Sequence, residues 1–116
     1  AVFSQSGVLV MSNIAYSDLW GHDPAATLGD GNISILCDYW RSQSAPSKIW
    51  DSAEVFVATL GDRTSLQGEI RMRDGRLVDC RFSALPGGAT LATFRLAGAI
   101  ASRSPGFATA RVSKTA

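Results

Sequence analysis

The sequence predicts an α+β domain in which helices cover one face of a five-stranded antiparallel sheet. Residues 65–96 alternate apolar and polar positions with the period of two that is typical of half-buried strands. Residues 1–12 have the pattern of a further hairpin, whereas the apolar residues of 13–60 follow helical spacing. Because a sheet with one apolar face must bury that face, we expect the middle of the chain to pack on it.

The 65–96 stretch divides into three strands. Between them lie a turn at Asp74-Gly75 and a break at 86–88, which reads Pro-Gly-Gly. The small or apolar residues expected on the inner face are Leu66, Gly68, Ile70, Met72, Val78, Cys80, Phe82, Ala84, Ala92, Phe94 and Leu96. A two-residue loop at the first turn would place Asp79 and Arg81 among them, so a longer loop is expected.

Two three-residue loops remain open at this turn. The first spans 73–75, puts its final glycine in the left-handed conformation and places Ile70 opposite Val78. The second spans 74–76 and gains cross-strand ion pairs of about 0.2–1 kcal/mol each. It also forces Arg76 to be left-handed, which costs about 1–2 kcal/mol. The first loop is favoured because glycine takes its left-handed position, although the gain from the ion pairs and the cost of a left-handed Arg76 are close.

The N-terminal third is predicted to contain a hairpin and a helix. The strands Ala1–Phe3 and Val8–Met11 flank a turn of polar residues. The helix begins after Ser12-Asn13, ends at Gly21 and buries a face made by Tyr16, Leu19 and Trp20. A loop then leads to a short helical turn expected at Ala25–Leu28.

Two further helices are expected before the strands. The first, within 29–46, buries Ile33, Leu36, Cys37 and Trp40. The second, Ser47–Leu60, has Ser47 as its N-cap, Gly61 at its end and a buried stripe of Ile49, Ala53, Phe56, Val57 and Leu60. Trp20, Trp40 and Trp50, with Phe56 and Phe82, are interpreted as core residues.

Composition narrows the classes of function. The net charge of +1 is close to neutral and the basic residues are scattered, so nothing indicates a nucleic acid or an anionic membrane surface. No apolar run is long enough to span a membrane. The cysteines, Cys37 and Cys80, have no metal-binding spacing; two reduced thiols in a cytosolic domain are expected, with a disulfide or a reactive thiol as the alternatives.

Several short motifs together resemble a PAS domain of the kind found in bacterial sensor histidine kinases. The similar stretches, in chain order, are Gly7–Asn13 with Ala15-Tyr16, Leu19-Trp20-Gly21, Arg73–Arg76, and Leu85–Leu91 with Thr93-Phe94. The resemblance covers residues 1–97, and we take 98–116 as a linker or partly disordered tail. Leu96–Ala99 departs from the family pattern, because it lacks the Asp-x-Thr triad that passes the signal onward.

The resemblance implies a cytoplasmic sensory module of a signal-transduction protein. It also implies a homodimer and a downstream kinase or output domain in the parent chain. This fragment is not expected to be an enzyme, since it contains no phosphoacceptor-histidine helix and no ATP-binding glycine motif. The alternatives are a ligand-free dimerisation module and a small isomerase-like enzyme, which would need an ionisable group in its pocket.

The same resemblance places any ligand between the sheet and the helices. The expected lining residues are Leu36, Trp40, Ile49, Phe56, Leu66, Ile70 and Phe82. No cofactor, metal or catalytic residue is predicted. The long helix has no histidine for haem, Cys37 lacks the flavin-adduct motif, and His22 is interpreted as structural or merely exposed.

Overall fold

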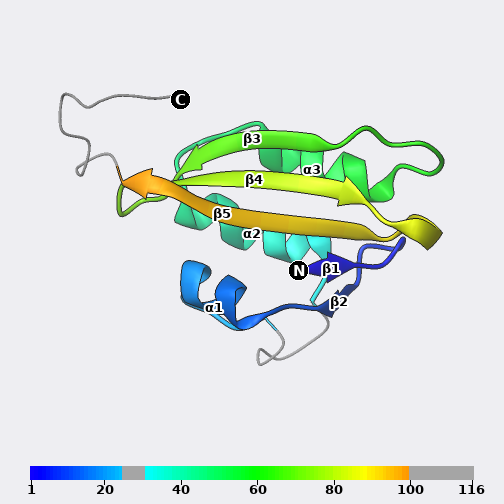
Figure 1. The fold of residues 1–116 in the computed structure, drawn as a ribbon, viewed down its shortest axis with the longest axis horizontal. Helices are drawn as coiled ribbons and strands as arrows, with labels where there is room; N and C mark the ends of the chain where they lie inside the picture. The colour runs from blue at the N-terminus through cyan, green and yellow to red at the C-terminus, as the bar shows by residue number, and fades with distance from the viewer. Residues whose placement is uncertain (25–30, 100–116) are drawn as a thin grey trace.

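The computed structural model describes residues 1–24 and 31–99. In this part of the chain a five-stranded antiparallel sheet has the order β2-β1-β5-β4-β3. Its strands are β1 (Val2–Phe3), β2 (Leu9–Met11), β3 (Leu66–Arg71), β4 (Arg76–Ala84) and β5 (Thr90–Ala99). Figure 1 shows helices behind the sheet, so the predicted α+β, PAS-like arrangement is confirmed.

The turn between β3 and β4 adopts the first of the two loops considered. Ile70 lies opposite Val78, as that loop requires, and Gly75 has a φ of 93°. The backbone N–H of Met72 donates to the carbonyl of Arg76 at 2.8 Å and closes the loop over 73–75. The left-handed position therefore falls on glycine, which adopts it without the steric cost that another residue would bear.

The three helices connect the two halves of the sheet. They are α1 (Ile14–Trp20), α2 (Ile33–Gln43) and α3 (Ile49–Ala58). The side chains of Asn13 and Asn32 accept hydrogen bonds from Tyr16 and Ile35 and thereby cap α1 and α2. Gly21 ends α1, as predicted, and the structure shows it in the left-handed conformation.

Some details of the prediction were wrong. Leu60 was expected in the buried stripe of α3, but the helix ends at Ala58 and the Leu60 side chain is 69% exposed. Ser47 is not the N-cap of α3, although its hydroxyl accepts from the backbone N–H of Ile49. Leu96 was expected on the inner face, but its side chain is 54% exposed although it lies opposite the buried Val78.

The expected boundary at residue 97 falls inside β5, which continues to Ala99. The short helical turn expected at Ala25–Leu28 and the tail from residue 100 onward lie outside the described residues. No helix in the described part is both long and apolar enough to cross a membrane. Cys37 and Cys80 are both buried and unbonded to each other.

Candidate functional site

The seven residues expected to line a ligand pocket all belong to one hydrophobic core. Six of them are buried, and the seventh, Leu66, packs at the rim and is half-buried. The structure therefore brings together every residue of the set: Leu36, Trp40, Ile49, Phe56, Leu66, Ile70 and Phe82.

The indole of Trp40 occupies the centre of this core and is completely buried. Its ring centroid lies 5.0 Å from that of Phe94, 5.4 Å from Trp50 and 6.2 Å from Phe82. Trp50 and Phe82 are also completely buried. Aromatic rings thus fill the space between sheet and helices in which a ligand was considered, in keeping with their interpretation as core residues.

Hydrogen bonds hold the two central tryptophans in place. The indole N–H of Trp40 donates to the Tyr16 hydroxyl at 2.8 Å, and that of Trp50 donates to the Ser44 hydroxyl at 3.2 Å. The Ser44 hydroxyl in turn donates to the Trp40 carbonyl at 2.7 Å. Sequence analysis did not identify Ser44, since a serine that follows a predicted helix gives no sign that it will be buried.

The buried ionisable groups of the core are held in their neutral forms. Burial raises the pKa of the Tyr16 hydroxyl, and of the Cys37 and Cys80 thiols, to about 12. Each group has a higher pKa folded than unfolded, so its contribution to stability is intact below the unfolded pKa and is lost above it. The unfolded values are 9.0 for the thiols and 10.0 for Tyr16, and the loss therefore falls between pH 9 and about 12.

The free energy of unfolding should therefore decline as the pH rises above about 8.5. Each group contributes a slope of at most about 1.4 kcal/mol per pH unit. Urea titrations at pH 8.0, 9.5 and 10.5 measure this decline. The Tyr16→Phe variant, in which only the thiols remain, should show a shallower decline above pH 10, and an unchanged slope would contradict the assignment to Tyr16.

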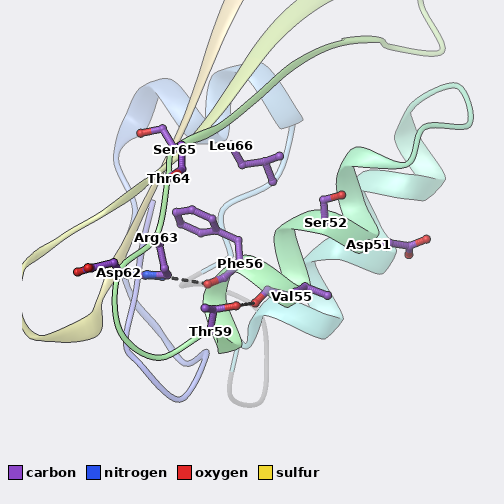
Figure 2. A pocket seen from close by; sticks show the side chains of 10 residues that line it. All are labelled: Asp51, Ser52, Val55, Phe56, Thr59, Asp62, Arg63, Thr64, Ser65 and Leu66. Carbon is purple, nitrogen blue, oxygen red and sulfur yellow. Dashed lines mark hydrogen bonds between the residues drawn. The ribbon is translucent and has the colours of Figure 1, made fainter.

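An open groove lies beside the core, between α3 and the segment that leads into β3. Figure 2 shows the Phe56 side chain on the helix pointing toward the 62–66 segment, and Ser52 and Val55 of the same helix also line the groove. Its volume is about 500 Å³. Phe56 and Leu66 belong to both the groove and the expected pocket lining, so they connect the surface with the core.

Arg63 closes one end of the groove and links three parts of the chain. Its guanidinium donates to the Phe56 carbonyl at 3.1 Å and to the Thr90 hydroxyl at 2.6 Å. It also donates to the carbonyls of Gly88 and Ala89, and it stands 4.7 Å from the centre of the Phe56 ring. Sequence analysis interpreted 62–64 only as a link, because a single arginine in a loop gives no sign of such contacts.

His22 packs against the Tyr39 ring, with their ring centroids 4.9 Å apart. Among the described residues its Nδ1 has no hydrogen-bond partner, and the same holds for the buried Nε1 of Trp20. Tyr39 donates its hydroxyl proton to the Trp20 carbonyl at 2.7 Å. The described part of the chain contains no group of three or more His, Cys, Asp or Glu side chains that could hold a metal ion.

Comparison of the chain with protein-family models, with curated proteins and with solved structures gave no match. The arguments about function therefore rest on the residues and on the fold.

Proposed function

We propose that this chain is a PAS-type sensory or regulatory module of a cytoplasmic signal-transduction protein, and that its parent is a sensor histidine kinase. The observation that carries the proposal is the strand order β2-β1-β5-β4-β3 with helices between β2 and β3. The stretches that resemble the PAS family include positions where a helix begins or ends and where one strand turns into the next. Asn13 caps α1, Gly21 ends it, and Asp74-Gly75 forms the β3–β4 turn.

In the proposed mechanism, a ligand or partner changes the packing of the sheet or of the dimer, and this change shifts the conformational equilibrium of a downstream element. β5 is central to it, because it pairs with both β1 and β4 and its far end leads toward whatever follows in the parent chain. A shift of the helices against the inner face would reach β5 through Trp40 and Phe94, whose rings are in contact. A homodimer would carry such a shift to two output domains at once.

Native mass spectrometry of the purified chain tests the two parts of this proposal separately. A dimer mass is expected at about 10 µM. A co-purifying small molecule would indicate a ligand-binding module, and its absence would agree with a module that binds no ligand. A monomer at every concentration up to about 100 µM would contradict dimerisation by the chain itself. A bound small molecule that acts as a substrate and is turned over would contradict a regulatory role.

One observation favours a second candidate, a dimerisation module that binds no ligand. Trp40, Trp50 and Phe82 are completely buried and fill the centre of the fold. In such a module the signal would be a change of partner or of dimer packing. The isomerase-like alternative would need an ionisable group in its pocket; burial raises the pKa of the core groups Tyr16, Cys37 and Cys80 to about 12, so these groups are neutral at pH 7 and none can act there as a general base.

A further inference from the structure

The turn between β3 and β4 contains a chemically reactive step of the backbone, the peptide bond between Asp74 and Gly75. The side-chain carboxyl of an aspartate lies near the backbone nitrogen of the residue that follows it. Glycine leaves this nitrogen unhindered, because it has no side chain and adopts backbone conformations that other residues avoid. A Cβ atom added to Gly75 would meet no described atom within 4 Å, and the Asp74 side chain is 56% exposed. Neighbouring residues therefore do not block a reaction at this bond by steric hindrance.

The reaction is an intramolecular condensation followed by a hydrolysis. The nitrogen of Gly75 forms a bond to the side-chain carboxyl carbon of Asp74, and the proton of that nitrogen leaves with the carboxyl hydroxyl as water. The product is a cyclic succinimide. Water then adds to one of the ring carbonyls and restores either aspartate or isoaspartate, in which the backbone runs through the side-chain carbon. Water is the sole co-reactant, and the overall change is an isomerisation.

Arg76 holds the Asp74 carboxyl in its unreactive form. The Nε of Arg76 donates to the two carboxylate oxygens at 3.1 and 2.9 Å, and its backbone N–H donates to one of them at 3.1 Å. The side-chain hydrogen bond from Arg76 is the main cause that lowers the pKa of the Asp74 carboxyl below its usual value. Ring closure needs the neutral carboxylic acid, since a carboxylate has no hydroxyl to lose as water. It also needs the carboxyl to turn away from Arg76.

The backbone of the turn restrains the other reacting group. The N–H of Gly75 donates to the Met72 carbonyl at 3.0 Å, and this hydrogen bond must open before the nitrogen can attack. Arg76 is itself fixed from outside the turn, because its guanidinium donates to the Leu19 carbonyl of α1 at 3.1 Å. The Arg76 side chain is half-buried as a result. The folded protein thus restrains both reacting groups through contacts that unfolding would release.

From these contacts we infer that Asp74-Gly75 is a site of spontaneous backbone isomerisation, and that Arg76 is a positioning residue that keeps this reaction slow in the folded protein. The inference does not depend on the proposed function, because the reaction requires the turn and water alone. An isoaspartate adds one carbon atom to the backbone of the loop that sets the β3–β4 register. Isomerised molecules should therefore lose the hydrogen bond from the Met72 N–H to the Arg76 carbonyl, which closes the loop.

The experiment follows the uptake of heavy oxygen from isotopically enriched water by the complete 116-residue chain near neutral pH. Each opening of a succinimide places one heavy oxygen atom at the residue that reacted, and peptide mapping by mass spectrometry locates it. The sequence contains one other Asp–Gly step, Asp30-Gly31, which serves as the reference for the chemistry of each sample. In about 8 M urea, where the chain is unfolded, both steps should react at similar rates. In the folded protein, uptake at Asp74 should be at least about fivefold slower than in urea.

Variants of the two arginines of the turn identify the residue that protects Asp74. Arg76→Met should raise uptake at Asp74 about threefold in the folded protein, because it removes the guanidinium. Arg76→Lys should restore part of the protection, since an ammonium group also favours the carboxylate. Arg73→Met is the matched control, because Arg73 lies in the same turn but its side chain donates to the Ser42 carbonyl. This control should change uptake at Asp74 by less than about twofold.

A further control separates this local effect from a general loss of stability. Phe82→Leu alters a completely buried side chain of the core and leaves the side chains of the turn unchanged. Its uptake at Asp74 should also stay within about twofold of that of the unaltered chain. Each variant is first shown to be folded by its amide NMR spectrum. The comparison of the folded and unfolded forms of the unaltered chain requires no variant and remains decisive if Arg76→Met does not fold.

Three results would overturn the inference. The first is no uptake at Asp74 in urea while Asp30 reacts, which would show that the step is not reactive. The second is equal uptake at Asp74 in the folded and the unfolded chain, which would show that the fold gives no protection. The third is an Arg76→Met variant that is folded and takes up heavy oxygen at Asp74 no faster than the Arg73→Met or Phe82→Leu variant.

Discussion

The Trp40→Ala variant is expected to lose about 3–5 kcal/mol of the free energy of unfolding, the largest effect of any single substitution considered for this chain. The Trp40 side chain is completely buried and its ring contacts those of Trp50, Phe82 and Phe94. Its removal leaves a cavity and also deprives the Tyr16 hydroxyl of a donor. Urea unfolding followed by far-UV circular dichroism measures the loss.

Such a loss is a large part of the 5–15 kcal/mol that is typical of a small domain. A milder variant, Phe82→Leu, should therefore be measured alongside and is expected to lose about 1–2 kcal/mol. Ile14→Ala is the control, because Ile14 is 79% exposed and its truncation should change stability by less than about 0.5 kcal/mol. A Trp40→Ala loss no greater than that of the control would contradict a tightly filled core.

Arg63→Met is the second substitution with a large expected effect, a loss of about 2–4 kcal/mol. Arg63 joins the end of α3 to the start of β5 through the carbonyls of Phe56 and Ala89 and through the buried hydroxyl of Thr90. Methionine retains much of the apolar volume but none of these hydrogen bonds. Thermal and urea unfolding of the variant measure the effect.

Arg71→Met is the matched control for this substitution, because Arg71 is exposed and forms no ion pair within the described residues. Its effect should stay below about 0.5 kcal/mol. Arg63→Lys should restore only a minor part of the loss, since an ammonium group cannot reach several acceptors with the fixed fork of a guanidinium. Equal stability of the Arg63→Met and Arg71→Met variants would show that the Arg63 contacts contribute nothing.

The sheet could be predicted from the sequence because its signals are local. Alternation with a period of two assigned faces to residues 66–72 and 78–82, and those assignments hold in the structure. The turn could be narrowed to two loops, and the left-handed position of Gly75 explains why one of them is adopted. The helix start at Asn13 likewise follows from capping chemistry within a few residues, whereas the cap at Asn32 was not predicted.

What could not be predicted depends on contacts between distant segments. Arg63 meets Thr90, 27 residues away, and Ser44 bridges to Met72. Leu60 fits the helical stripe by spacing, but the helix ends two residues before it. The expected lining residues do converge, yet the aromatic rings that accompany them fill the space, and a list of apolar positions does not reveal how completely rings pack together.

The proposal that this chain is a regulatory module of a longer kinase is tested most directly on that proposed parent protein. The measurement is the rate of ATP-dependent autophosphorylation with and without residues 1–99. The account predicts that deletion changes this rate by at least about fivefold while the KM for ATP is unchanged. An equal rate with and without the module, or a parent chain with no kinase or other output domain, would contradict it.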